Sequence, residues 1–414
     1  MASQVTNYQC PSCSGPLHFD GATGRLKCDY CRSSYEVAEI EALYAEKDAK
    51  AAAAKKAEEE AAREAASAAA ASPDEPADDG AAAAFDGAET APDGMMTALG
   101  GASSEDTSEW DTSELQSDWG SDADGMKIYS CPSCGAELIC DATTAATSCP
   151  YCRNVSIVPG QFADELKPDY VIPFKLSKQD AVNALKKHYG KKPLLPKAFS
   201  DANHIAEVKG VYVPFWMFDG VAEGSVTFEA TRSHSHRSKG YEITETDHFD
   251  VQRSGELAFE NVPVDASSKM LDDYMDSIEP FDYSELKPFS TAYLPGFFAD
   301  KYDVSAQDSF ERADERCKGS FEAAMAKTVT GYNSCTTKAA DIRLRRGKVH
   351  YALLPVWVLN TNWEGKDFLF IMNGQTGKLV GALPASFKRA AALFLAIAAV
   401  LIALGSAFVL YLLS

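Results

Sequence analysis

The sequence predicts an α+β protein with two small four-cysteine modules, a duplicated helix-plus-antiparallel-sheet body, a disordered acidic linker and one C-terminal transmembrane helix. Three observations lead to this prediction: a cysteine pattern that occurs twice, a proline-containing strand motif that occurs twice, and a long uncharged stretch near the C-terminus. The expected boundaries are 1–35 and 126–160 for the cysteine modules, 36–71 for a helix rich in Ala, Glu and Lys, 72–125 for the linker, 161–386 for the body and 388–414 for the membrane anchor.

Eight of the 11 cysteines form two copies of one pattern, in which two CxxC pairs are separated by fourteen residues. The copies match at 11 of 23 aligned positions, which indicates an internal duplication. Each CxxC is a tight turn that directs two thiolates to one point, and two such turns complete the tetrahedral four-sulfur site that suits Zn²⁺. The expected ligands are Cys10, Cys13, Cys28 and Cys31 in the first module and Cys131, Cys134, Cys149 and Cys152 in the second.

Such a site is structural, because the protein fills all four positions and leaves none for a reactive water. The expected cofactors are therefore two structural Zn²⁺ ions. Disulfides are disfavoured by the doubled spacing and by the reducing cytoplasm that the rest of the sequence indicates. A rubredoxin-type iron centre uses the same four ligands and stays open as an alternative.

The segment between the two modules is predicted to be a helix followed by an acidic tether. Residues 36–71 contain no Gly or Pro and consist mainly of strong helix formers. Residues 72–125 hold 15 of the 60 carboxylates and no Lys or Arg, so most of the net charge of −21 belongs to this stretch. Few of its residues are large and apolar, which predicts disorder. The exceptions Trp110, Leu115 and Trp119 form a candidate motif for a protein partner, with an inert tether as the alternative.

The body contains two similar halves, each with a helix that follows a capping serine and then a strand with the pattern Pro-x-Trp. The motif residues are Pro214 and Trp216 in the first half and Pro355 and Trp357 in the second, and the capping residues are Ser177 and Ser305. Proline inside a strand predicts an edge position or a bulge. The sequence Arg253-Ser-Gly255 predicts a tight turn between two further strands.

The body has no recognisable catalytic motif, because it lacks a phosphate-binding loop, HExxH, GxSxG and the kinase signatures. Glu223 and Glu364 recur at the same place in the two halves. Duplicated carboxylates at a strand–turn junction are most simply structural. We therefore expect no enzymatic activity.

Two basic clusters could contact an anionic surface, either nucleic acid or lipid headgroups. The alternative for both is an ordinary solvated strand face. The overall acidity argues against a general nucleic-acid binder, because affinity for phosphate comes from clustered Lys and Arg. The first cluster lies on a predicted hairpin tip and comprises Arg232, His234, His236, Arg237 and Lys239, and the second lies on a predicted strand and comprises Arg343, Arg345, Arg346 and Lys348.

Residues 390–413 carry no charge, and a helix of this length spans a bilayer core of ~30 Å. Lys388 and Arg389 directly precede it, and basic residues favour the cytoplasmic side. The N-terminal residues lack the basic and apolar regions of a secretory signal. We expect a single-pass protein of the cell membrane with its N-terminal body in the cytoplasm. Alanines at i, i+4 spacing, such as Ala392 and Ala396, permit a homo-oligomer through the anchor.

Each cysteine module resembles a zinc ribbon of the transcription-factor-IIB type, with the start CPxCGxxL at residues 131–138. The whole layout resembles bacterial tail-anchored proteins that carry such ribbons, a group of uncharacterised function. Some of that group occur with flotillin-like and phage-shock-like membrane-stress proteins, so the resemblance implies partners of these kinds. We expect a membrane-anchored scaffold or adaptor that recruits protein partners, with a membrane-tethered nucleic-acid-binding, transcription-related regulator as the alternative.

Overall fold

The computed structural model describes residues 8–47, 49–50, 109–115, 119, 126–141, 148–160, 166–190, 192, 194–196, 199, 208–238 and 240–413. The chain forms two compact units, one of Met1–Val37 with Asp106–Ser414 and one of Ala38–Glu105. In the second unit, the described part of the expected Ala/Glu/Lys-rich helix is helical. Lys50 and Glu46 form an i, i+4 ion pair there. The predicted linker up to residue 108 lies outside the described residues.

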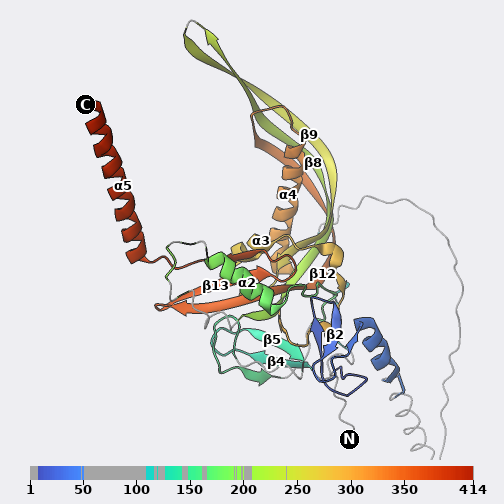
Figure 1. Ribbon diagram of the computed structural model, residues 1–414. Helices are drawn as coiled ribbons and strands as arrows, with labels where there is room; N and C mark the ends of the chain where they lie inside the picture. The colour runs from blue at the N-terminus through green and yellow to red at the C-terminus, as the bar shows by residue number, and fades with distance from the viewer. Residues whose placement is uncertain are drawn as a thin grey trace, which may run out of the picture. The chain divides into compact units, whose positions relative to one another are not determined.

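The first unit confirms the predicted mixture of helices and antiparallel strands (Figure 1). A three-stranded sheet consists of β1 (Leu17–Asp20), β2 (Arg25–Cys28) and β3 (Ser34–Tyr35). The larger sheet contains β4 (Met126–Ser130), β5 (Glu137–Asp141), β6 (Val158–Gly160), β7 (Tyr170–Val171), β8 (Lys209–Ser238), β9 (Tyr241–Asp265), β10 (Lys287–Pro288), β11 (Phe298–Asp300), β12 (Ser334–Trp363), β13 (Lys366–Asn373) and β14 (Leu379–Gly381). The first unit contains the α-helices α2 (Lys178–Tyr189), α3 (Asp272–Ile278), α4 (Phe310–Lys327) and α5 (Phe387–Leu413). The unit also contains the 3-10 turns η4 (Tyr283–Glu285), η5 (Thr291–Tyr293) and η6 (Gln307–Ser309).

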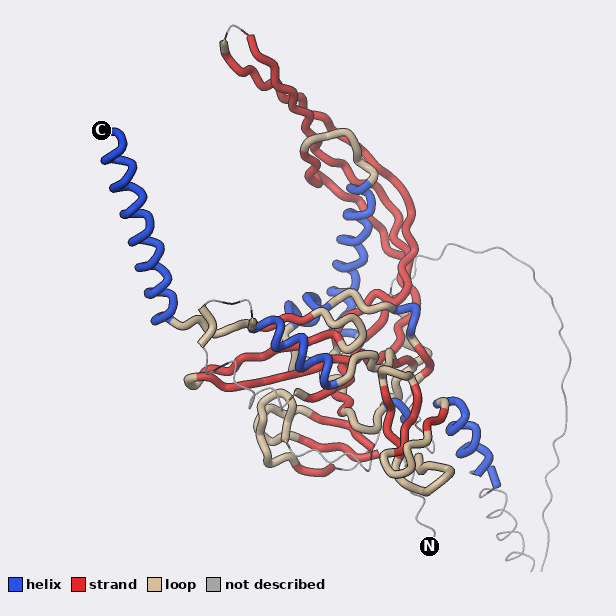
Figure 2. Tube along the Cα trace, viewed as in Figure 1, coloured by secondary structure: helices blue, strands red, loops and turns tan. Residues whose placement is uncertain are grey.

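The strand order of the large sheet is β10-β7-β12-β8-β11-β5-β4-β6. β9 pairs with β8, while β13 pairs with β12 and then with β14. β8, β9 and the first part of β12 continue together as a long arm, which helix α4 accompanies (Figure 2). We define the arm as residues 224–255 of β8 and β9 with residues 334–342 of β12.

The two halves of the body are related by an approximate two-fold axis, in agreement with the repeated motif in the sequence. β8 and β12 pair antiparallel, and Val213 lies opposite Leu354, which is its own equivalent in the other half. β11 runs parallel to β8, and β7 runs parallel to β12 at the equivalent register. Each half therefore contributes one short strand, one capped helix and one long strand to a common core.

The repeated tryptophans connect the halves to each other. Trp216 Nε1 donates a hydrogen bond to the carbonyl of Val304 at 3.0 Å, immediately before the second helix cap. Trp357 Nε1 donates to the carbonyl of Leu176 at 3.2 Å, immediately before the first helix cap. The tryptophan of each half thus hydrogen-bonds to the residue just before the capping serine of the other half. At the first entry, Ser177 and Asp180 form the expected capping box.

The expectation of an edge position or a bulge for the two strand prolines is wrong, because β8 and β12 are central strands. Pro214 lies where the outer neighbour of β8 changes from β11, which pairs with Tyr212, to β9, which pairs from Phe215 onward. Pro355 lies at the equivalent change from β7 to β13. At the position where one neighbouring strand ends and the next begins, no hydrogen bond from a backbone N–H to that side of the sheet is required. A proline, which has no N–H, is therefore tolerated there.

The two Glu-Gly pairs have different roles in the halves. Glu364 and Gly365 both have positive φ, 51° and 77°, and form the two-residue turn between β12 and β13. Glu223 and Gly224 instead lie within β8, which continues into the arm. The predicted turn at 253–255 is also wrong, because these residues belong to the continuous strand β9.

Helix α5 is long and apolar enough to cross a membrane. The span is Phe387–Phe408. An 18-residue stretch of it has a mean hydropathy of 2.5, and none of that stretch is buried. Ser386 precedes the helix, and its Oγ accepts a hydrogen bond from the backbone N–H of Arg389 at 3.4 Å.

Candidate metal centres and interaction surfaces

The eight predicted ligand cysteines lie on four turns with the same backbone geometry. In each turn, the N–H of the first cysteine donates to the carbonyl five residues later, and the N–H four residues later donates back to the carbonyl of that cysteine. The residue at this fourth position has a positive φ in all four turns: Ser14 (60°), Arg32 (61°), Gly135 (71°) and Arg153 (63°). Only one of the four residues is glycine, so no repeated glycine marks this left-handed position in the sequence.

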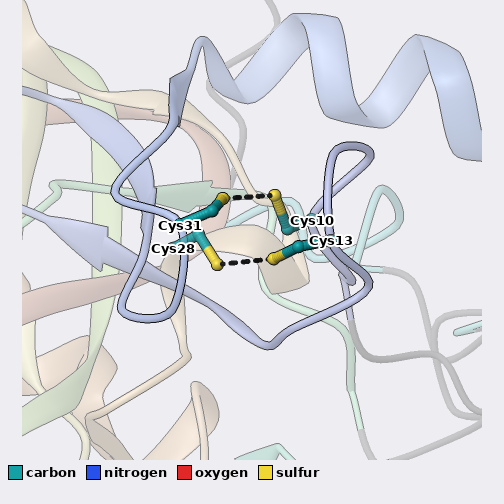
Figure 3. A group of neighbouring side chains, drawn as sticks. All are labelled: Cys10, Cys13, Cys28 and Cys31. Atoms are coloured by element: carbon teal, nitrogen blue, oxygen red, sulfur yellow. Dashed lines mark hydrogen bonds between the residues drawn. The ribbon is translucent and has the colours of Figure 1, made fainter.

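These turns bring the cysteines together in two groups, as the spacing predicts. The four sulfur atoms of each group lie within 4.8 Å of one another. Figure 3 shows the first group, Cys10, Cys13, Cys28 and Cys31. The measured Sγ–Sγ distances are 3.4 Å for Cys10–Cys31, 3.5 Å for Cys13–Cys28, 3.4 Å for Cys131–Cys152 and 3.6 Å for Cys134–Cys149. A tetrahedral metal with bonds of ~2.3 Å places its sulfurs roughly 3.8 Å apart, whereas a disulfide needs ~2.05 Å. Both groups therefore fit a metal ion, and the eight cysteines are free thiols.

In each group, the first cysteine ionises more readily than a free thiol. Burial opposes ionisation of Cys10, but hydrogen bonds from the hydroxyl of Tyr35 and the backbone of Ser12 lower its pKa to about 6. Burial also opposes ionisation of Cys131, but backbone hydrogen bonds from Cys134 and Ser133 lower its pKa to about 7. Metal ligands must be deprotonated, so each site offers a thiolate near neutral pH.

The second four-cysteine module, which we call ribbon 2, is part of the body. Its strand β5 pairs with β11 and so extends the large sheet. Tyr151, between the last two ligands, is buried, and its carbonyl accepts a hydrogen bond from the side chain of Asn360. Arg153 forms an ion pair with Asp367 at 2.8 Å.

The first module, ribbon 1, exposes the residues that ribbon 2 uses for docking. Tyr30 is the equivalent of Tyr151, and its exposed fraction is 78% compared with 7% for Tyr151. Arg32 is the equivalent of Arg153, and it is exposed. Ribbon 1 contacts the body through Phe19, whose ring packs edge-on against Tyr293 at a centroid distance of 5.1 Å.

Asp300 is a buried carboxyl next to ribbon 2. Its exposed fraction is 1%, the hydroxyl of Ser267 donates a hydrogen bond to one of its oxygens at 2.6 Å, and the hydroxyl of Tyr151 is a second polar neighbour. Burial raises the pKa of Asp300 from 3.8 to about 7, although the hydrogen bond from Ser267 favours the charged form. The folded protein therefore keeps a proton on Asp300 that the unfolded chain releases above about pH 4.

We expect Asp300→Asn to change the pH dependence of stability. The pKa of Asp300 is higher in the folded protein than in the unfolded chain, so its contribution to the free energy of unfolding is full below about pH 4. This contribution is lost as the pH rises to about 7, by roughly 1.4 kcal/mol per pH unit. The variant lacks this proton, so its free energy of unfolding should fall less than that of the wild type between pH 5 and pH 8. Urea unfolding of the full chain in detergent measures this difference, and equal pH slopes for both proteins would contradict the assignment.

No family model matches the sequence, and no solved structure matches it. The chain is 40% identical to the "Uncharacterized protein YdjG" of Bacillus subtilis (strain 168) over 319 residues, covering 94% of that protein and 65% of this chain. This chain belongs to the YdjG family. The name of YdjG states no activity.

In this member of the YdjG family, the candidate partner motif and the strand cluster of cations contact each other. Trp110 is buried, its ring packs against Phe218 at 4.9 Å, and its Nε1 donates to Asp314 at 3.1 Å. Asp111 forms a parallel bridge with Lys348 of β12 through its backbone. Trp119 is also buried and packs against Phe289. These parts of the expected tether are therefore bound to the body, while Leu115 is half-buried.

The strand cluster on β12 is largely neutralised by carboxylates of the same chain. Arg345 pairs with Glu256, Arg346 with Asp314 and Lys348 with Glu114. Arg343 is exposed. Three of the four cations that could have contacted an anionic surface are therefore paired within the chain, with carboxylates of β9, of α4 and of the segment that contains Glu114.

The other basic cluster does lie at a hairpin tip, between β8 and β9. His234 faces Glu245 at 2.9 Å, and the guanidinium of Arg232 lies over the rings of Phe249 and Tyr332. Lys239 lies outside the described residues. Two of the four described members of this cluster, Arg232 and His234, therefore have neighbours within the same chain.

A network of arginines and carboxylates that the sequence did not predict joins β9, α3 and α4. Burial raises the pKa of its innermost carboxyl, Asp265, to about 6. The ion pairs are Arg312 with Asp265, Asp272 and Asp276, and Arg316 with Asp276 and Glu279. The i, i+4 spacing of the two arginines was the available signal. The network fixes α3 against α4.

Proposed function

We propose that this protein is a single-pass protein of the cell membrane whose cytoplasmic body is a scaffold that recruits protein partners, with Zn²⁺ in both four-cysteine sites. The observation that carries this proposal is the different use of one residue in the two ribbons. Tyr151 is buried against the body, whereas its equivalent Tyr30 is 78% exposed. Tyr151 docks ribbon 2 on the body of this chain, and the exposed Tyr30 is available to dock ribbon 1 on a second protein in the same way.

The docked ribbon suggests the chemistry of the partner. In ribbon 2, the tyrosine is buried in an apolar core and Arg153 meets the carboxylate of Asp367. In ribbon 1, Arg32 has no ion-pair partner among the described residues. A partner with an apolar pocket beside an Asp or Glu would therefore fit Tyr30 and Arg32. The resemblance to proteins found with flotillin-like and phage-shock-like components makes such membrane-stress proteins the first partners to examine.

Zn²⁺ would be held by all four cysteines of each ribbon, and it would supply structural stabilisation rather than a reactive site. The four sulfur atoms of each group lie within 4.8 Å of one another, which fits this ion. We assign no enzymatic activity, because four protein ligands leave no position for substrate. The alternative of a nucleic-acid-binding regulator has less support, because three of the four cations on β12 contact carboxylates.

Proximity labelling with the full-length chain in membranes tests this proposal. The variant combines Tyr30→Ala with Arg32→Glu, and the matched control combines Tyr241→Ala with Arg237→Glu at the hairpin tip, where Tyr241 is 76% exposed. We expect at least a tenfold loss of the main labelled proteins with the ribbon 1 variant and no loss with the control. Both proteins should retain two Zn²⁺ per chain, as measured by elemental analysis.

The scaffold proposal would be rejected if the intact, anchored chain labelled no protein reproducibly. It would also be rejected if the ribbon 1 variant and the control gave the same labelling as the wild type. Iron in place of Zn²⁺ would correct the assignment of the metal and leave the proposed docking surface unaffected.

A further inference from the structure

A patch of unpaired positive charge lies where α2 ends and the anchor begins. This basic patch comprises Lys186 and Lys187 in the last turn of α2, Lys192 in the following loop and Lys388 at the start of α5. All four side chains are exposed, and none has a carboxylate partner among the described residues. Lys191 and Lys197 belong to the same stretch of sequence but lie outside the described residues.

Hydrogen bonds attach this part of the body to the first residues of the anchor. The backbone N–H of Ser386 donates to the carbonyl of Leu194 at 2.9 Å. The guanidinium of Arg389 donates to the carbonyl of Leu195. Because Ser386 caps α5, the loop after α2 is held at the end of the helix that enters the bilayer.

The packing of α2 turns the basic patch toward solvent. Ala181, Leu185 and Tyr189 form the buried side of the helix, so Lys186 and Lys187 point away from the core. Burial lowers the pKa of His188, and the charge of Lys192 lowers it further, which places Lys192 close to the last turn of α2. The three lysines therefore act as one group.

The basic patch differs from the cations on β12, which the sequence made the stronger candidates. Arg345, Arg346 and Lys348 all contact carboxylates of this chain. The lysines of the basic patch have no such carboxylate contact among the described residues. At the base of a membrane helix the nearest anionic surface is the lipid headgroup layer, and headgroup charges act over about 8 Å at physiological salt.

We infer that the basic patch binds the headgroups of anionic phospholipids and so holds this face of the body against the bilayer. The attraction expected for one lysine near an anionic membrane surface corresponds to about a fivefold preference for an anionic over a neutral bilayer. For three lysines the preference is roughly a hundredfold. This binding is independent of whether ribbon 1 recruits a protein.

Lysine footprinting of the full-length chain in nanodiscs tests the inference. One set of discs contains phosphatidylcholine alone, and the other contains phosphatidylcholine with phosphatidylglycerol. We expect an acylating reagent to react at least fivefold more slowly with Lys186, Lys187 and Lys192 in the anionic discs. Lys318 and Lys327, which are exposed on α4, serve as internal controls and should react equally in both. Raising the salt to about 1 M shortens the Debye length to about 3 Å and should remove the protection.

Charge reversal gives a second measurement on the same system. The variant Lys186→Glu, Lys187→Glu, Lys192→Glu should lose the phosphatidylglycerol that co-purifies with the wild type from mixed bilayers. The matched variant Lys318→Glu, Lys327→Glu, Arg343→Glu should retain it. The inference is overturned if protection is the same in both kinds of disc, if excess inorganic phosphate protects the lysines in discs of phosphatidylcholine alone, or if the matched variant loses the lipid equally.

Discussion

Cys149→Ser should unfold much of the body, whereas Cys13→Ser should remove one metal ion and leave the body folded. Cys149 is fully buried and belongs to the same core cluster as Val211, Val213 and Leu354 of the central strands. A structural Zn²⁺ contributes ~10 kcal/mol to the folding of a small domain, and ribbon 2 cannot lose it without exposing this core. Cys13 is exposed in a turn that precedes β1, and the three strands of its module form a sheet of their own. Circular dichroism and metal content of the full chain in detergent measure the two outcomes.

Cys140→Ser is the control for the loss of a buried thiol. Cys140 lies in ribbon 2 and is fully buried, but it does not belong to the four-sulfur group. We expect this variant to keep both metal ions and its secondary structure. If Cys149→Ser remained folded like Cys140→Ser, ribbon 2 would be an appended module and not a part of the body.

Trp110→Ala should release the segment 109–115 from the body and lower the free energy of unfolding by about 3 kcal/mol. The indole is 5% exposed, contacts the ring of Phe218 and donates its hydrogen bond to Asp314. The mutation removes the buried indole together with its ring contact and its hydrogen bond. Urea unfolding gives the free energy, and hydrogen exchange of the segment shows its release.

The matched change is Leu115→Ala, which shortens a half-buried side chain of the same segment. Its cost should be below about 1 kcal/mol, and it should leave the exchange of residues 109–111 unchanged. An effect of Trp110→Ala no larger than this would mean that the segment is not held by its tryptophan.

The metal ligands could be predicted from the sequence because their geometry is local. A CxxC turn needs only a few neighbouring residues, and the repeated spacing identifies two such turns as one site. The duplication of the body was also visible, because Pro214 and Pro355 stand in the same pattern as Trp216 and Trp357. The structure adds that the tryptophans hydrogen-bond across the two halves.

The association of the acidic segment with β12 could not be predicted, because composition is an average over many residues. Residues 72–125 are poor in large apolar side chains, and this average predicts disorder. Two tryptophans are enough to bind the end of this stretch when a complementary surface exists. That surface depends on residues far away in the chain, so the opposite charges of Glu114 and Lys348 looked like two unrelated features.

The extent of the arm was missed because its glycines resemble turn signals. Gly224 and Gly255 face each other in the sheet, and a side-chain carbon at Gly224 would lie 2.1 Å from the carbonyl oxygen of Asp341. These glycines permit a close approach of β12 and the neighbouring helix, which is the other common reason for glycine in a strand. Sequence alone does not distinguish this packing role from a turn at 253–255.

The crossed tryptophan bonds have a consequence for the origin of the body. A polypeptide consisting of one half alone would leave its helix entry without a donor, and a second copy would supply that donor about a two-fold axis. We therefore expect such a half to form a dimer, and the present chain has the arrangement of two such halves joined end to end. Joining removed the requirement that both copies stay identical. One hairpin could then lengthen into the arm while the other kept its two-residue turn at Glu364 and Gly365.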